Sequence, residues 1–172
     1  MKYNMDKNFK IGVIGSGTMG NGIAHIAAQS GFKTILVDIN KTQLDKAILT
    51  IDHNLDRQIK KKQISLSDKG AIINNILPTT NIHDCQNMDL VIEAISEKYD
   101  LKASIFKQLD TICKKTTILA SNTSSISISN LGNKTKRADK VIGMHFMNPV
   151  PIMKLVEVIN TIHTSDETKN KI

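Results

Sequence analysis

A short apolar segment, a glycine-rich turn and an amphipathic segment follow one another near the start of the chain. Residues 10–14 are mostly apolar, as in a buried strand, and residues 19–30 place apolar side chains on one face of a helix. A second apolar segment, residues 34–38, comes next. Because a strand, a helix and a second strand in this order form a parallel βαβ unit, the segment predicts an α/β fold.

The turn inside this unit predicts a dinucleotide site. GxGxxG spacing is weak evidence alone, but here the glycines lie between a predicted strand and a predicted helix. The first glycine permits a tight turn, the second lets the backbone approach a pyrophosphate, and the third lets the helix pack closely on the strand. Free N–H groups and the helix dipole would then hold the phosphates. The predicted cofactor-binding residues of the turn are Gly15, Ser16, Gly17, Thr18, Met19 and Gly20.

Asp38 indicates which dinucleotide is bound. It ends the second predicted strand, 18 residues after Gly20, where a carboxylate accepts hydrogen bonds from the adenosine ribose. Its charge would repel a 2′-phosphate, so the sequence favours NAD over NADP. The alternative is that Asp38 only caps the helix that begins near Lys41.

The rest of the chain continues to alternate strands and helices. This alternation predicts a Rossmann-type, mostly parallel sheet with helices on both faces, and ligands bound beyond the carboxyl ends of its strands. Further strands are expected at residues 89–95, 117–120, 141–145 and 155–158. Further helices are expected at about 41–59, 67–76 and 101–113, behind a cap at Ser124 or Ser125, and from Thr164 to the last residue with Ser165 as cap.

Composition excludes several other classes of protein. The 172 residues are 40% hydrophobic, include no 18-residue apolar run, and start with a polar segment, Met1–Phe9, unlike a secretory signal. We therefore expect a cytoplasmic protein that neither spans nor enters a membrane. Cys85 and Cys113 have no metal-ligand spacing and are expected to be buried or half-buried free thiols, and the five histidines predict no metal site.

The net charge of +7 leaves three interpretations of the basic surface. A basic nucleic-acid-binding protein is one of them, but aromatic residues make up 3% of the chain and Trp is absent, so base-stacking side chains are scarce. A lysine-rich solvated surface and the attraction of a phosphate-rich cosubstrate are the other two. We expect a small-molecule partner and no nucleic acid.

The segment 141–159 carries the side chains best suited to chemistry. His145 stands at the end of one predicted strand, and Glu157 stands twelve residues later on the next, beyond a loop with Pro149 and Pro151. A carboxylate that holds the second nitrogen of a histidine forms a general acid–base unit. Structural roles for both residues stay open on spacing alone. The hydroxyl cluster at residues 121–125 could cap a helix or could bind a substrate hydroxyl or a nicotinamide amide.

Four segments of the chain form a specific combination: VIGSGTMGNGIA, DLVIEAISE, ASNTSS and GMHFMNPVPIMKLVEVI. Together they resemble the NAD-binding domain of the 3-hydroxyacyl-CoA dehydrogenases, particularly the 3-hydroxybutyryl-CoA branch, from about Phe9 to about Thr161. The resemblance implies NAD-dependent oxidation of a 3-hydroxyacyl-CoA to the 3-oxoacyl-CoA, or the reverse reduction, as in fatty acid and butanoate metabolism.

The resemblance also implies a role for individual residues. His145 matches the family's base, Glu157 matches the carboxylate that orients it, and Ser124 matches the serine between substrate oxygen and nicotinamide. Positions that line the family's cofactor pocket are matched by Glu97, Lys102 and Asn148. Positions that contact coenzyme A are matched by Asn54 and Lys61, although the family usually has serine where Asn54 stands.

The family continues beyond the length of this chain. Its members add a last strand and a helical domain that forms the dimer and closes over the acyl chain. We therefore expect residues 1–172 to be the NAD-binding domain alone, truncated at its carboxyl end. Three explanations stay open: a piece of a longer enzyme, a short protein that pairs with a separate helical chain or forms an oligomer through it, and an NAD-binding module without turnover.

Overall fold

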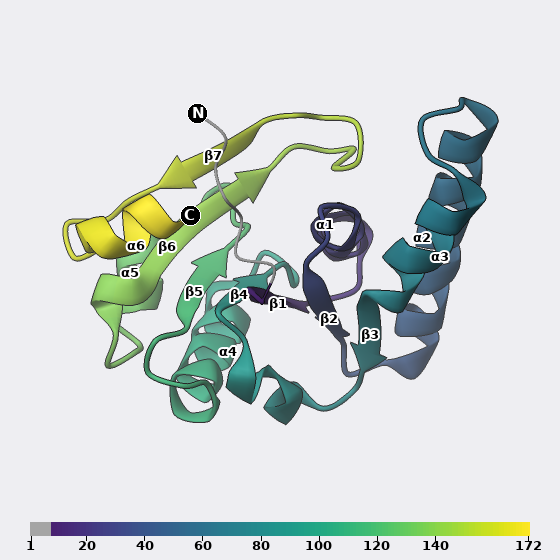
Figure 1. The fold of residues 1–172 in the computed structure, drawn as a ribbon. Helices are drawn as coiled ribbons and strands as arrows, with labels where there is room; N and C mark the ends of the chain where they lie inside the picture. Colours follow the sequence, from purple (N-terminus) through teal and green to yellow (C-terminus); the bar gives the residue numbers. More distant parts are fainter. Residues whose placement is uncertain (1–7) are drawn as a thin grey trace.

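The computed structural model describes residues 8–172, in which one twisted sheet has helices packed on both faces (Figure 1). The strands lie in the order β3-β2-β1-β4-β5-β6-β7, in which β1 to β6 are parallel and β7 is antiparallel to β6. The strands are β1 (Lys10–Ile14), β2 (Lys33–Val37), β3 (Ile76–Thr79), β4 (Leu90–Glu93), β5 (Ile118–Ser121), β6 (Val141–Phe146) and β7 (Val156–Ile159).

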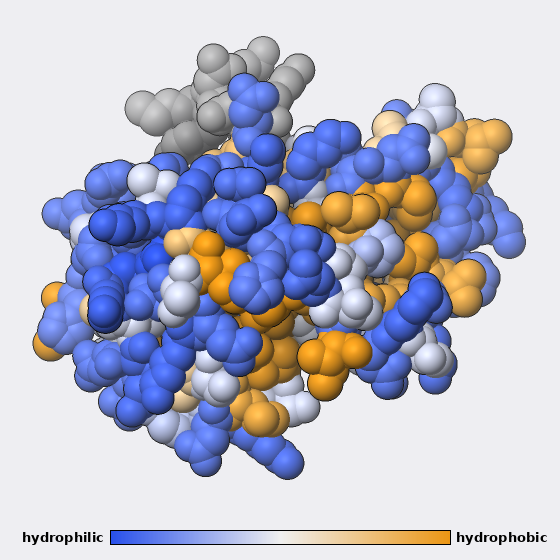
Figure 2. Space-filling model, turned by 90° about the horizontal axis from the view of Figure 1, so that it is seen from below, coloured by the Kyte–Doolittle hydropathy of each residue, from blue (hydrophilic) through white to orange (hydrophobic). Residues whose placement is uncertain are grey.

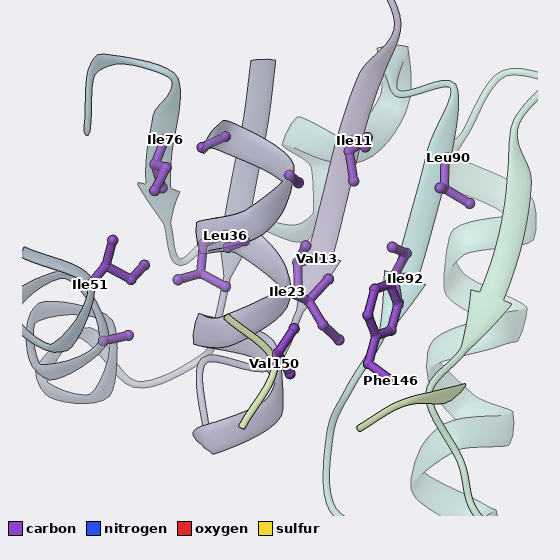
Figure 3. Packing of buried hydrophobic residues seen from close by; sticks show 14 of the residues in the cluster. Ile11, Val13, Ile23, Leu36, Ile51, Ile76, Leu90, Ile92, Phe146 and Val150 are labelled. Carbon is purple, nitrogen blue, oxygen red and sulfur yellow. The ribbon is translucent and has the colours of Figure 1, made fainter. Parts of the chain in front are cut away.

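Two apolar clusters, one on each side of the sheet, hold the helices in place. Ile11 and Val13 of β1 join the cluster beneath α1, α2 and α3, whereas Ile14 joins the cluster beneath α4 and α5. Figure 3 shows part of the first cluster, with side chains of α1 and α2 over the strands. The helices are α1 (Thr18–Gln29), α2 (Lys41–Lys60), α3 (Leu66–Asn74), α4 (Tyr99–Ile112), α5 (Ile128–Gly132), α6 (Asp166–Lys171) and the 3₁₀ helices η1 (Ile82–Asn87) and η2 (Ala138–Lys140).

This architecture confirms the predicted Rossmann-type sheet. Strands buried on both faces are typical of parallel sheets, and their near-continuous apolar sequences made them recognisable. The order of the strands reverses between β1 and β4, so the carboxyl ends of these two strands flank the crevice in which such folds bind ligands. The glycine-rich turn follows β1 directly and lies at this crevice.

The strand β3 was not expected from the sequence. We predicted a helix over residues 67–76 with Pro78 just past its end, but α3 stops at Asn74 and Pro78 lies inside β3, paired with Leu36. Proline has no N–H to donate to a neighbouring strand. It is tolerated here because β3 is at the edge of the sheet, where one side of the strand has no partner.

The predicted cap of the short helix behind β5 was wrong. Ser127, and not Ser124 or Ser125, caps α5 by accepting a hydrogen bond from the Asn130 N–H. The N–H groups of Ser124 and Ser125 donate instead to the carboxylate of Glu97. The other predicted serine cap is confirmed, since the side chain of Ser165 accepts from the Thr168 N–H at the start of α6.

Within residues 8–172, no helix combines the length and apolarity needed to cross a membrane. The same residues hold no cluster of three or more side chains able to bind a metal ion.

Cys85 and Cys113 are buried free thiols, as predicted, and burial raises the pKa of Cys85 to about 12 and that of Cys113 to about 11. Much of the face in Figure 2 is hydrophilic, with hydrophobic residues gathered near its middle. Most of the polar segment Met1–Phe9 lies outside the described residues.

Candidate nucleotide and acid–base site

The backbone of the turn after β1 requires glycine at two positions. Gly15 has a φ of +97°, and its N–H donates to the Val37 carbonyl at 2.7 Å. A Cβ on Gly20 would lie 1.7 Å from the carbonyl oxygen of Gly15, so no larger residue fits there. A Cβ on Gly17 would meet nothing within 4 Å. The turn is therefore tight on its inner side and open at Gly17, the position predicted to face a pyrophosphate.

Asp38 lies at the carboxyl end of β2, beside this turn. Its Oδ2 accepts hydrogen bonds from the N–H and the hydroxyl of Ser16, both at 2.8 Å, and its Oδ1 accepts from the Asn40 N–H at 3.0 Å. Partial burial acts to raise the pKa of Asp38, but these hydrogen bonds hold it below its usual value. The cap of α2 is Asn40, which accepts from the Gln43 N–H. The carboxylate of Asp38 is thus ionised and aligned with the turn, and it does not cap α2.

His145 and Glu157 face each other across the last two strands. They are register partners in the antiparallel pair of β6 and β7, and Nδ1 of His145 lies 2.8 Å from Oε2 of Glu157. The loop between the strands, with its two prolines, returns the chain so that the two side chains fall on the same face. The side chain of His145 is 25% exposed and that of Glu157 is 53% exposed, so the pair is accessible to a ligand.

Two adjoining hollows meet at His145 and Ser124. The first, of about 320 Å³, opens toward the glycine-rich turn and is lined in part by Met19, Glu97 and Asn148. The second, of about 380 Å³, lies on the β7 side and is lined by Glu157 and by residues 123–129. Ser124 and His145 line both. A hydroxyl and an imidazole on the border of two hollows can act on a group held in one while a second group occupies the other.

Glu97 is accessible from the first hollow, whereas Lys102 is buried. Glu97 lines the first hollow and accepts hydrogen bonds from the loop after β5. Partial burial opposes its ionisation, but a hydrogen bond from the Thr123 hydroxyl and the charge of Lys102 lower the pKa of Glu97 to about 2. The side chain of Lys102 is only 1% exposed and lies behind the hollow, with its Nζ between Glu93 and Glu97.

Of the two residues predicted to contact coenzyme A, Asn54 lies on α2 and Lys61 directly follows its last residue. The side-chain oxygen of Asn54 accepts a hydrogen bond from Arg57 at 3.2 Å, and Lys61 is an exposed residue at the carboxyl end of the helix. Neither residue lines the two hollows. The structure therefore brings Ser124, His145 and Glu157 together with Met19, Glu97 and Asn148 among the predicted cofactor residues, but not with Asn54 or Lys61.

Asn122 was not among the predicted site residues. It lines the first hollow, and its Oδ1 accepts a hydrogen bond from the Phe146 N–H at 2.8 Å. This bond joins the end of β5 to the end of β6, next to His145. Its position in the sequence could have predicted it, because Asn122 is a polar residue directly after a buried parallel strand.

Comparison with known proteins shows the family of the chain. Residues 10–172 match the family described as 3-hydroxyacyl-CoA dehydrogenase, NAD binding domain. The chain is 47% identical over 159 residues to a 3-hydroxybutyryl-CoA dehydrogenase of Clostridioides difficile, and this match covers 92% of the chain and 57% of the relative. It is 46% identical to the enzyme of the same name from Bradyrhizobium diazoefficiens, over 92% of the chain and 54% of the relative. The chain thus spans little more than half the length of these relatives.

Solved structures give the same assignment. The crystal structure of (S)-3-hydroxybutyryl-CoA dehydrogenase from Ralstonia eutropha matches 92% of this chain with a TM-score of 0.90 and 48% identity, over 56% of its own length. That of 3-hydroxybutyryl-CoA dehydrogenase from Escherichia coli matches 95% with a TM-score of 0.93 and 39% identity, over 35% of its own length. The chain belongs to the family of NAD-binding domains of 3-hydroxyacyl-CoA dehydrogenases.

Proposed function

We propose that this chain supplies the NAD-binding and acid–base part of an enzyme that interconverts a 3-hydroxyacyl-CoA and the 3-oxoacyl-CoA. The observation that carries the proposal is the position of Ser124 and His145 on the border of two hollows, one of which opens toward the glycine-rich turn. The names of the relatives favour 3-hydroxybutyryl-CoA as the substrate.

The residues around the turn fit NAD. Residues 15–20 would hold the pyrophosphate, since the space beside Gly17 is open and the helix begins at Thr18. Ionised Asp38 would accept hydrogen bonds from the adenosine ribose. Glu97, Ser124 and Asn148, which line the first hollow, would surround the nicotinamide. Bound NAD would supply the hydride acceptor at this place.

The acid–base work is assigned to the pair on β6 and β7. In the oxidation, Nε2 of His145 takes the proton of the 3-hydroxyl while the hydride leaves C3. Glu157, at 2.8 Å from Nδ1, fixes the tautomer of the ring and stabilises the imidazolium that forms. The hydroxyl of Ser124 holds the substrate oxygen. The chain thereby keeps C3, the nicotinamide and His145 in line for the transfer.

The coenzyme A part of the substrate is assigned to α2, by resemblance to the family. Asn54 is half-buried, whereas Lys61 is exposed at the carboxyl end of the helix. Lys61 would pair with a phosphate of coenzyme A, and Asn54 would contact the nucleotide. The lysine surplus of the chain favours such a polyanionic ligand.

A second part of the enzyme completes this proposal. The relatives are nearly twice as long as the matched region, and we propose that a helical domain, in the same or in a separate chain, forms the dimer and covers the acyl group. The alternative is an NAD-binding module that is inactive until that domain is present.

The test is NADH consumption with acetoacetyl-CoA. We expect activity from the chain when the helical domain of a full-length relative is supplied, and slower or no activity without it. NADH binding with no consumption in either case would leave only the binding module, and the absence of NADH binding would overturn the proposal.

A further inference from the structure

A buried ion pair lies directly behind the first hollow. Glu93 is the last residue of β4 and Lys102 belongs to the second turn of α4, and their side chains are 0% and 1% exposed. Nζ of Lys102 lies 2.6 Å from Oε1 of Glu93. Burying two charges costs several kcal/mol per ion before their attraction offsets it, and apolar residues of similar volume often replace such pairs without loss of stability. Stability of the fold is therefore a weak explanation for this ion pair.

The remaining hydrogen-bonding groups of the pair join three segments at the site. Oε1 of Glu93 accepts from the Ile95 N–H at 2.7 Å, and Oε2 accepts from the Ser121 hydroxyl at 2.6 Å. Lys102 also donates to the Ile95 carbonyl at 3.3 Å, and its Nζ lies 3.2 Å from Oε2 of Glu97. The pair thus ties together the ends of β4 and β5, the start of α4, and the carboxylate of Glu97.

The other carboxylate oxygen of Glu97 holds the loop that carries Ser124. Oε1 accepts from the hydroxyl of Thr123, from the N–H groups of Ser124 at 3.1 Å and Ser125 at 3.3 Å, and from the Ser125 hydroxyl at 3.1 Å. One side of Glu97 therefore contacts Lys102, and the other side fixes the backbone of residues 123–125. Ser124, whose N–H donates to Glu97, lines both hollows.

We propose that Glu93 and Lys102 are positioning residues that act through Glu97 to hold Ser124 at the nicotinamide end of the site. Lys102 then acts from behind the wall of the hollow, where its side chain is 1% exposed. The inference rests on the proposed function, because it specifies how that site orders the nicotinamide half of the dinucleotide. Asp38, which would hold the adenosine half, contacts Ser16 and Asn40 and makes none of these contacts.

If the inference is right, loss of the ion pair should weaken binding of the nicotinamide half of the cofactor and leave binding of the adenosine half unchanged. The double variant Glu93→Gln with Lys102→Met removes both charges, so that no unpaired charge stays buried. Lys114→Met is the matched control, since it removes the 2.6 Å ion pair with Asp89 at the opposite end of β4. Each protein is titrated with NADH and with ADP-ribose, which lacks the nicotinamide.

We expect the double variant to bind NADH roughly tenfold more weakly, the effect of losing about one charge-assisted hydrogen bond. Its affinity for ADP-ribose should be unchanged, and Lys114→Met should change neither affinity. NADH affinity equal to that of the wild type would overturn the inference, and so would an equal loss for both ligands, which would mean support of the fold alone. A wild-type chain that bound neither ligand would overturn the proposed function together with this inference.

A milder variant keeps the test decisive if the double variant does not fold. Ser121→Ala removes one hydrogen bond to Glu93 and leaves both charges paired. We expect faster amide hydrogen exchange at Ser124 and Ser125 and weaker NADH binding, with ADP-ribose binding unchanged. Unaltered exchange at these two amides would contradict the coupling through Glu97.

Discussion

At the scale of single residues, the account depends most on the pair of His145 and Glu157. We predict that His145→Ala lowers turnover by about 10²- to 10⁴-fold, the usual contribution of general acid–base catalysis. NADH affinity should be unchanged, because the imidazole acts on the substrate. The measurement is a kinetic assay with acetoacetyl-CoA, in the presence of the helical domain, together with an NADH titration.

His163→Ala is the control for this change, since His163 is exposed and lines neither hollow. It should leave turnover and NADH affinity as they are. Turnover of His145→Ala within about tenfold of the wild type would contradict the role of the base, whose removal should cost at least a hundredfold.

Asp38 is the residue that we propose sets the choice between the two dinucleotides. The ionised carboxylate should repel the 2′-phosphate of NADPH, and a like-charge contact of this kind costs several kcal/mol. We predict that the wild type prefers NADH and that Asp38→Asn reduces the preference, mainly because NADPH binds more tightly. Fluorescence titration of both proteins with both dinucleotides measures the ratio. Equal affinities in the wild type would refute this role.

At the scale of secondary structure elements, α1 contains a histidine that resists protonation. His25 is 0% exposed, and neither ring nitrogen has a hydrogen-bond partner among the described residues. Burial lowers its pKa below the ordinary value of 6.5. The unfolded chain then binds a proton that the folded chain does not, so stability falls as the pH decreases below about 6.5.

We predict that this residue lowers the free energy of unfolding by up to about 1.4 kcal/mol for each pH unit between pH 6.5 and 5. The melting temperature of the wild type should fall over this range more steeply than that of His25→Leu. His163→Gln, which changes an exposed histidine, should follow the wild type. Parallel curves for the wild type and His25→Leu would show that the ring is protonated in the fold.

The elements also show what the sequence could and could not predict. The βαβ unit around Gly15 and Gly20 was predicted because strand, turn and helix are contiguous, and the same holds for the hairpin that pairs His145 with Glu157. The edge strand with Pro78 was missed because its pairing with β2 depends on a partner about forty residues away in the sequence. The contact of Asn122 with Phe146, 24 residues apart, was missed for the same reason. Contacts between distant segments leave little local pattern.

At the scale of the whole molecule, the sheet gathers the chemistry at the carboxyl ends of its parallel strands. The glycine-rich turn after β1, the aspartate after β2 and the hydroxyl loop after β5 all come from this edge. The antiparallel strand β7 then brings Glu157 to His145 at the end of β6. One end of the sheet thereby holds the residues proposed to bind the dinucleotide next to the pair proposed for acid–base catalysis.

The central claim is that this arrangement transfers a hydride between NAD and C3 of an acyl-CoA. The most direct measurement is mass spectrometry of the product formed from acetoacetyl-CoA with NADH deuterated at C4, in the presence of the helical domain. Mass spectrometry detects even slow turnover. We predict that one of the two C4-deuterated diastereomers, and not the other, gives 3-hydroxybutyryl-CoA with deuterium at C3, and that His145→Ala gives far less. Product without deuterium from either diastereomer, or no product at all, would contradict the account.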